Sequence, residues 1–180
     1  MKDTTKTHIM HSCNSLLREI PFEKITVSMI AKRSGVSKPT FYRYFLDKYD
    51  AVNYSYKKFL DKWVSSSGCS SWRDFYVRMY SASQHDSKLL KNAYSAAGIN
   101  SYKEFLYHYS YKAIENSATK CRSGAPLTRE EELHLAIFCY GVIAVDYEWI
   151  NGNLSYTVEE MAELTYLALP GSLRDLWWNP

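Results

Sequence analysis

Residues 26 to 48 constrain the fold of this chain more than any other stretch. They read T-V-S-M-I-A-K-R-S-G-V-S-K-P-T-F-Y-R-Y-F-L-D-K, which is two short helical patterns separated by a glycine. Thr26 can N-cap a helix over residues 27 to 34, and Gly35 stands where a left-handed residue commonly follows a helix. Ser37 can cap the next helix. The spacing predicts a helix-turn-helix.

The second helix of this pair has two distinct faces. Phe41 and Phe45, four residues apart, face inward, and Pro39 falls in the first turn, where a missing N–H costs little. The opposite face carries small polar, aromatic and cationic side chains. An outer face of this kind is typical of a helix that reads DNA.

Charge is distributed unevenly along the chain. Residues 1 to 62 contain 12 lysines and arginines against 6 aspartates and glutamates, whereas residues 63 to 180 contain 10 against 13. A basic module that binds a polyanion, followed by a neutral or acidic module, explains this asymmetry. A solvated surface with uneven charge is the alternative.

Composition also bears on compartment and cofactors. The four cysteines are scattered and lack zinc-ligand spacing, which indicates reduced thiols, and we expect neither a metal site nor a cofactor. No signal peptide is recognisable at the N-terminus. The most apolar stretch, Leu133 to Ile150, is interrupted by His134, Asp146 and Glu148. We therefore expect a cytoplasmic, nucleoid-associated protein that does not bind a membrane.

Helical periodicity runs through most of the chain, and few segments alternate with the period of a strand. We predict an all-α protein with a three-helix, helix-turn-helix DNA-binding domain over residues 1–47. A continuous helix over residues 48–64 joins it to a helical regulatory and dimerisation domain over residues 48–180. Capping residues and glycines, including Gly68 and Gly98, mark helix ends. The other predicted helices are 5–19, 72–83, 87–97, 102–121, 129–151 and 158–168.

Residues 8 to 60 resemble the DNA-binding domain of the TetR family of bacterial transcriptional regulators. The match rests on the run I-A-K-R-S-G-V-S-K-P-T-F-Y-R-Y-F-L-D-K, followed by an apolar helix. In that family the pattern is an apolar-alanine pair, a glycine-valine turn, a small-aromatic-tyrosine run that opens the recognition helix, and then a phenylalanine and a lysine. The resemblance implies a regulator that binds double-stranded DNA.

The resemblance assigns roles to individual residues. Thr26, at a helix N-terminus, offers hydroxyl and amide donors to a phosphate. Tyr42 and Lys48 resemble the family's contacts to the DNA backbone, which position the protein without reading sequence. Arg43 is the candidate for reading O6 and N7 of a guanine. The full set of expected DNA-contacting residues is Thr26, Ser28, Lys38, Pro39, Thr40, Tyr42, Arg43, Tyr44 and Lys48.

Two of these assignments have plainer alternatives. Tyr42 could be a packing residue, although Phe41 and Phe45 already fill the inner face. Arg43 could be a solvated charge that contacts only phosphate.

The C-terminal part of the chain is similar to that of a TetR subgroup that includes the activator of dihydroxyacetone kinase operons. The similarity lies in Y-G-V-I-A-V-D-Y-E-W-I-N-G, residues 140 to 152, and in the T-V-E-E-M-A-E-L that follows. The helix over residues 129–151 is apolar nearly all round and has to be covered on several faces. Pairing of this helix and helix 158–168 with the same two helices of a second subunit predicts an isologous four-helix interface. The expected interface residues are Leu133, Ile137, Tyr140, Gly141, Ala144, Met161, Leu164, Thr165 and Ala168.

Tyrosine is frequent between residues 72 and 121. An aromatic pocket with a few hydroxyl groups would suit a small apolar or aromatic effector. Core packing of the rings, with hydroxyl groups that reach the surface, explains the same residues. The candidate ligand-binding residues are Tyr76, Tyr80, Tyr94, Phe105, His108, Tyr109 and Phe138.

We therefore predict a homodimeric TetR-type repressor that binds a palindromic operator and is controlled by a small-molecule effector. An activator or co-regulator controlled by a protein partner is the alternative that the C-terminal similarity suggests. An enzyme is disfavoured, because the chain has no nucleophile-elbow motif, no phosphate-cradling glycine loop and no obvious acid-base cluster.

Overall fold

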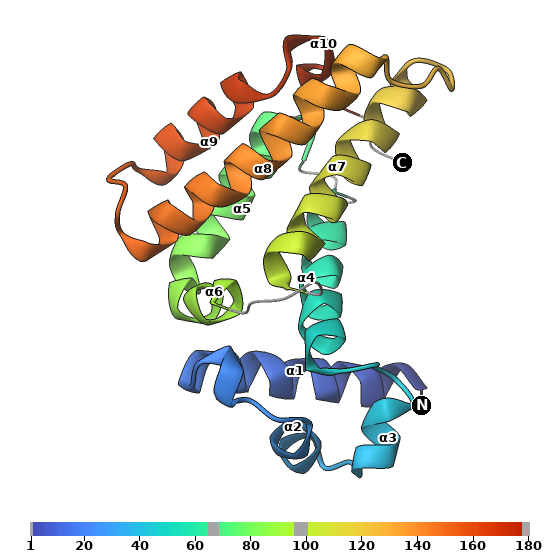
Figure 1. The fold of residues 1–180 in the computed structure, drawn as a ribbon, viewed down its shortest axis with the longest axis vertical. Coiled ribbons are helices and arrows are strands. Elements are labelled where there is room, and N and C mark those ends of the chain that lie inside the picture. Colours follow the sequence, from blue (N-terminus) through green and yellow to red (C-terminus); the bar gives the residue numbers. More distant parts are fainter. Residues whose placement is uncertain (1, 65–68, 96–100, 178–180) are drawn as a thin grey trace. The chain divides into compact units, whose positions relative to one another are not determined.

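A computed structural model describes residues 2–64, 69–95 and 101–177 of the protein (Figure 1). Within these ranges the regular elements are all helices and no strand is present, which confirms the predicted fold class. The elements are α1 (Lys2–Glu19), η1 (Phe22–Lys24), α2 (Val27–Ser34), α3 (Lys38–Tyr42), α4 (Lys48–Val64), α5 (Trp72–His85), α6 (Ser87–Tyr94), α7 (Tyr102–Cys121), α8 (Arg129–Asn151), α9 (Val158–Ala168) and α10 (Gly171–Arg174).

The ends of α8 and α9 follow the capping signals of the sequence. Thr128 and Glu131 form a reciprocal capping box, in which each side chain accepts from the backbone N–H of the other, and Thr157 and Glu160 do the same. Gly152 ends α8 with a φ of 84°, a left-handed conformation that glycine adopts without strain. Two further predicted helix ends, Gly68 and Gly98, lie outside the described residues.

Contacts divide the chain into two compact units, of which the first comprises Met1–Phe59 and Asp86–Phe105. Its core contains buried apolar side chains from α1, η1, the two short helices and the start of α4, together with Leu89 of α6. By contacts, this unit extends past the domain boundary predicted at residue 47 and includes α6. The boundary at residue 47 separates the predicted DNA-binding domain from the predicted regulatory domain, and it stays a prediction.

Polar contacts fasten α6 to α1 inside the first unit. Asn92 donates from Nδ2 to the carbonyl oxygen of Leu17 at 2.7 Å. The guanidinium of Arg18 forms a two-pronged ion pair with Asp86, the residue that precedes α6. A segment far along the sequence thereby becomes part of the N-terminal unit.

The second unit comprises Leu60–His85 and Leu106–Pro180. α5 packs against α9, and Tyr76 of α5 meets Phe138 of α8 edge to face, with ring centroids 6.5 Å apart. Near the C-terminal end, Ser117 of α7 donates its hydroxyl to the carbonyl oxygen of Leu176 at 2.7 Å. The C-terminal segment is therefore part of this unit's packing.

A buried polar cluster joins three helices of the second unit. Tyr80 of α5 donates its hydroxyl to Oδ1 of Asp146 on α8 at 2.5 Å, and its oxygen lies 2.8 Å from Oγ1 of Thr165 on α9. All three side chains are buried. Burial raises the pKa of Asp146 to about 7, and the hydrogen bond from Tyr80 opposes this shift.

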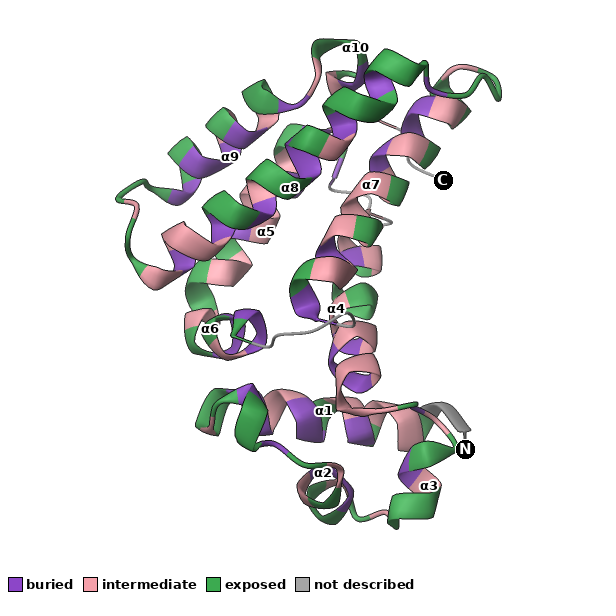
Figure 2. Ribbon diagram, in the orientation of Figure 1, coloured by how far each residue is buried: buried purple, intermediate pink, exposed green. Residues whose placement is uncertain are grey.

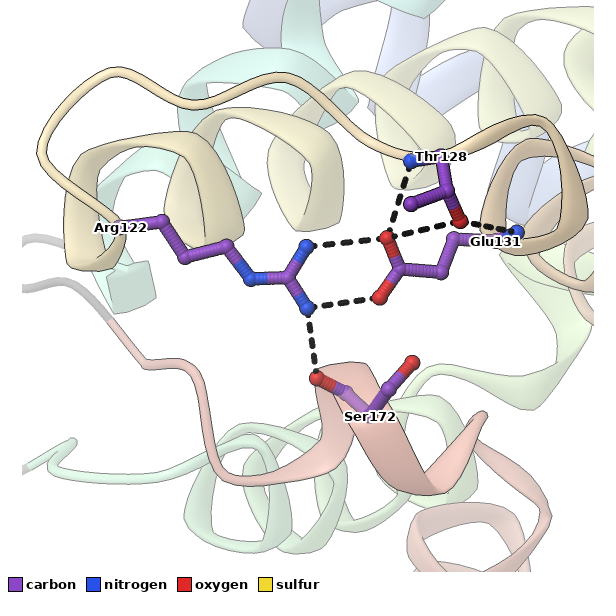
Figure 3. A network of polar contacts seen from close by, with 4 residues as sticks. All are labelled: Arg122, Thr128, Glu131 and Ser172. Carbon is purple, nitrogen blue, oxygen red and sulfur yellow. Dashed lines mark hydrogen bonds and ion pairs between the residues drawn. The ribbon is translucent and has the colours of Figure 1, made fainter.

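A second polar network lies near the surface, where α7 ends and α8 and α10 begin (Figure 3). The Arg122 guanidinium binds both carboxylate oxygens of Glu131, at 2.9 and 2.6 Å, and also donates to the carbonyl oxygen of Ser172 at 3.0 Å. Glu131 further accepts from the backbone N–H of Thr128 at 3.0 Å. The hydrogen bonds from Arg122 and then Thr128 hold the pKa of Glu131 well below its usual range.

Replacing Glu131 with glutamine should lower the free energy of unfolding at pH 7 by about 1 to 3 kcal/mol, because the guanidinium loses its charged partner. A depressed pKa means that this contribution is present above pH 4.5, the ordinary glutamate value, and is lost as the pH falls below it. Urea unfolding should therefore show a difference in the free energy of unfolding between variant and wild type that is smaller at pH 3 than at pH 7. Glu130→Gln is the matched control, and an equal gap at both pH values would contradict the role of the ion pair.

Candidate nucleic-acid interface

The candidate interface is built from α2, α3 and the turn between them, and the predicted helix-turn-helix is present. Thr26 caps α2, with its hydroxyl oxygen 3.2 Å from the donating N–H nitrogen of Met29. Gly35 follows α2 with a φ of 69°, in the left-handed region. Ser37 caps α3 and accepts from the N–H of Thr40 at 3.2 Å. Local capping chemistry thus fixes where α2 begins and ends and where α3 begins.

The predicted inward orientation of Phe41 and Phe45 is confirmed, although α3 ends at Tyr42 and Phe45 lies in the turn that follows it. Phe41 and Phe45 are 0% and 2% exposed, and their ring centroids lie 5.7 Å apart. On α2, Arg33 forms a two-pronged ion pair with Glu19 of α1. The helix pair is therefore held against α1 and the core of the first unit. Its outer face is left exposed on a rigid support.

Most of the predicted DNA-contacting residues are exposed, and Figure 2 shows exposed stretches along the ribbons of α2 and α3. Tyr42 is 56% exposed, which excludes the core-packing alternative. Within the described residues, Lys38 and Arg43 have no acidic partner, so both charges are available to a polyanion. The exposed members of the predicted set are Thr26, Ser28, Lys38, Pro39, Tyr42 and Arg43.

The other three predicted contacts are partly buried. Thr40 has its hydroxyl 2.9 Å from that of Ser37, and Tyr44 packs against the core of the first unit. Lys48 points its ammonium group at backbone carbonyl oxygens of the turn before Thr26. Sequence reasoning missed this use of Lys48, because its acceptors are more than 20 residues away along the chain.

The second unit exposes an apolar stripe on α8 and α9. On α8, Leu133 and Ile137 are 60% and 61% exposed, and on α9, Leu164 is 51% exposed. Tyr140, Gly141, Ala144 and Ala168 are exposed as well. The helical spacing from Leu164 adds Leu167, which the sequence interpretation left out.

Met161 and Thr165 do not belong to this stripe, contrary to expectation. They are 3% and 6% exposed, on the face of α9 that turns toward its own unit, where Thr165 meets Tyr80. Burial inside one chain leaves neither side chain available to a second copy. Self-association through the remaining residues stays a prediction.

The predicted ligand-binding residues do not gather in one unit. Tyr94 and Phe105 belong to the first unit, where both pack near Tyr102, and the rest belong to the second. In the second unit Tyr109 donates to Asp61 at 3.1 Å, and His108 is exposed. Tyr76, Tyr80 and Phe138 are buried. Their role in ligand binding stays a prediction, and packing accounts for the contacts seen.

A shallow hollow of about 470 Å³ lies on the second unit. Its lining comes from the N-terminal half of α8 and from the α9–α10 turn, and Ile137 of the apolar stripe is part of it. Phe138 alone among the predicted ligand residues lines it. Among the described residues, no group of three or more metal-ligating side chains occurs.

Comparisons with known proteins agree with this geometry. Residues 9–53 match the family described as "Bacterial regulatory proteins, tetR family", and residues 70–171 match "Transcriptional regulator C-terminal region". No curated protein matches the sequence.

Two solved structures share the fold over nearly the whole chain. A TetR transcriptional regulator from Rhodococcus sp. RHA1 is 18% identical, with a TM-score of 0.69 over 94% of this chain and 98% of that one. The dihydroxyacetone kinase operon activator DhaS is 13% identical, with a TM-score of 0.64 over 94% of this chain and 96% of that one. The helix-turn-helix and the helical C-terminal region together define a DNA-binding regulator of transcription. The chain belongs to the TetR family.

Proposed function

We propose that the protein binds a palindromic operator as a homodimer and represses transcription until a small-molecule effector releases it. The observation that supports this most directly is the outer face of α3. There Lys38 and Tyr42 of α3 and Arg43 at its C-cap are exposed, while Phe41 and Phe45 are buried. Such a protein acts in the cytoplasm, on the nucleoid.

In the proposed complex the residues divide into two groups. Thr26 and Tyr42 bind phosphates, which fixes the register of the protein on the duplex. Lys38, Thr40 and Arg43 face the base edges, and Arg43 reads a guanine through O6 and N7. Ser28, Pro39 and Tyr44 flank these contacts.

Dimerisation supplies the second recognition helix. α3 is five residues long, so a single copy reaches few base pairs. Two copies must place their recognition helices in successive major grooves, about 34 to 36 Å apart. We assign this contact to the apolar stripe on α8 and α9. Among the described residues, α8 is long and apolar enough to cross a membrane by length and composition alone. An interface on this helix accounts for its apolar character.

Replacing Arg43 with alanine should relax base preference at one position of each half-site. The bidentate contact to guanine contributes about 1 to 3 kcal/mol of discrimination, so the preferred duplex should lose affinity while a duplex with another base there loses much less. Fluorescence anisotropy on both duplexes at fixed salt measures this difference. Lys32→Ala, on the exposed face of α2, is the control, and equal loss on all duplexes for Arg43→Ala would show that Arg43 contacts only phosphate.

Control of the repressor is assigned to a population shift. An effector releases DNA only if it binds more tightly to the conformer whose half-sites no longer fit the operator. Control by a protein partner, with activation as the outcome, is the second candidate, and the likeness in fold to the dihydroxyacetone kinase operon activator favours it. Mass spectrometry of the purified protein tests for a retained small molecule, and co-purification of a stoichiometric protein supports the second candidate.

A further inference from the structure

The ammonium group of Lys48, the first residue of α4, is used inside the protein. Its Nζ atom lies 2.9 Å from the carbonyl oxygens of both Phe22 and Ile25, and 3.4 Å from that of Glu23. It also lies 4.3 Å from the centroid of the Phe22 ring. The side chain therefore closes the C-terminal end of η1.

These contacts occupy the N–H donors of the ammonium group, so none is left to bind a phosphate. A lysine has three N–H donors, and three carbonyl oxygens surround this one. Partial burial lowers the pKa of Lys48, against the opposing charges of Glu23 and Asp47, as expected for an ammonium taken out of water. A lysine that contacts DNA needs its charge and donors free, as those of Lys38 are.

The bond to Ile25 bears directly on Thr26. The carbonyl of Ile25 and the N–H of Thr26 belong to one planar trans peptide, so they point in opposite directions. When the carbonyl points at Lys48, the N–H of Thr26 is aimed away from the ammonium. This N–H has no acceptor among the described residues, and the Thr26 side chain is exposed.

We infer that Lys48 is a positioning residue, which orients the Ile25–Thr26 peptide so that the amide and hydroxyl of Thr26 together bind a DNA phosphate. The inference rests on the proposed function. It replaces the direct phosphate contact expected for Lys48 with an indirect one. The side chains of Phe22 and Ile25, 1% and 2% exposed, hold the other side of the same turn in the core.

The test measures the affinity of the full chain for a random-sequence duplex at several salt concentrations. Phosphate contacts are independent of sequence, so any duplex reports them. Lys48→Met removes the ammonium and keeps most of the apolar stem, and it should weaken binding about tenfold through loss of the Thr26 contact. The slope of log affinity against log salt should stay unchanged. Lys38→Met removes a free charge from the outer face of α3 and is the matched control, which should make the slope less steep, by up to about 0.9 for each subunit.

A double-mutant cycle with Thr26→Ala distinguishes positioning from a general loss of stability. If Lys48 acts through Thr26, the double variant should bind about as weakly as Lys48→Met alone, because the contact is already lost. Each variant is measured at a temperature where circular dichroism shows it folded. Additive losses, or a slope that becomes less steep by about 0.9 per subunit for Lys48→Met, would overturn the inference.

Amide hydrogen exchange provides a readout that does not need DNA. Lys48→Met should speed exchange across residues 22–30 and leave α9 unchanged, whereas Lys38→Met should alter neither. Unchanged exchange across residues 22–30 would also overturn the inference. Failure of the wild-type protein to bind any duplex at low salt would instead contradict the proposed function, and the exchange measurement would still decide whether Lys48 holds the turn.

Discussion

Replacing Ile137 with aspartate should convert the proposed dimer to a monomer and abolish operator binding. The side chain is 61% exposed in one copy and sits in the middle of the apolar stripe on α8. In an isologous interface one substitution enters twice, so two carboxylates replace two apolar side chains at a contact that excludes water. Like charges across an interface cost several kcal/mol, which corresponds to a rise in the dimer dissociation constant of roughly a thousandfold or more. Sedimentation velocity over a concentration series measures the change.

A conservative replacement at the same position separates interface from fold. Ile137→Leu keeps the apolar area and should remain a dimer with wild-type affinity for DNA. Circular dichroism should show the aspartate variant to be helical, because residue 137 is exposed in the single chain. A dimer that persists in Ile137→Asp at micromolar concentration would place self-association elsewhere.

Replacing Asp146 with asparagine should stabilise the protein at pH 8. The raised pKa of about 7 means that the folded state binds more protons than the unfolded one, so stability falls as pH rises from 3.8, the ordinary aspartate value, to about 7. Once the pH is above both pKa values, this pKa difference corresponds to a loss of about 4 kcal/mol in the free energy of unfolding. Asparagine keeps an oxygen that accepts from Tyr80 and carries no charge, so we expect a gain of roughly 2 to 4 kcal/mol at pH 8 and little or none at pH 4. Urea unfolding at a series of pH values measures it.

Asp61→Asn is the matched control for Asp146. Asp61 also accepts a hydrogen bond from a tyrosine, Tyr109, but is partly exposed. Its replacement should not reproduce the gain of roughly 2 to 4 kcal/mol at pH 8, because this carboxylate is not buried. The free energy of unfolding of the wild type should fall between pH 4 and pH 7 relative to that of Asp146→Asn. If it does not fall, the buried carboxyl group of Asp146 is not neutral as we expect.

Features set by neighbouring residues could be predicted from the sequence. The helix-turn-helix depends on caps and a left-handed glycine within a few residues of the helices they end, so Thr26, Gly35 and Ser37 suffice to place it. The inward spacing of Phe41 and Phe45 is also local, and the structure confirms it. The capping boxes at the starts of α8 and α9 depend on residues three apart and are local in the same way.

Features that depend on distant segments could not be predicted. α9 is apolar on more than one face, so periodicity alone did not separate Leu164, which is exposed, from Met161 and Thr165, which pack inward. The carbonyl acceptors of Lys48 become visible only when the chain is folded. The aromatic residues of the predicted pocket are divided between two units by a chain path that returns to the first unit at α6.

Selection of bound duplexes from a random pool by the 180-residue chain tests the central claim most directly. A dimeric operator-binding regulator should enrich an inverted repeat whose half-sites are centred one helical turn, about 10 base pairs, or a multiple of it apart. The base preferences within each half-site should change when the outward residues of α3 are replaced. A pool that shows no enriched sequence, or only a single unrepeated site, would contradict the account.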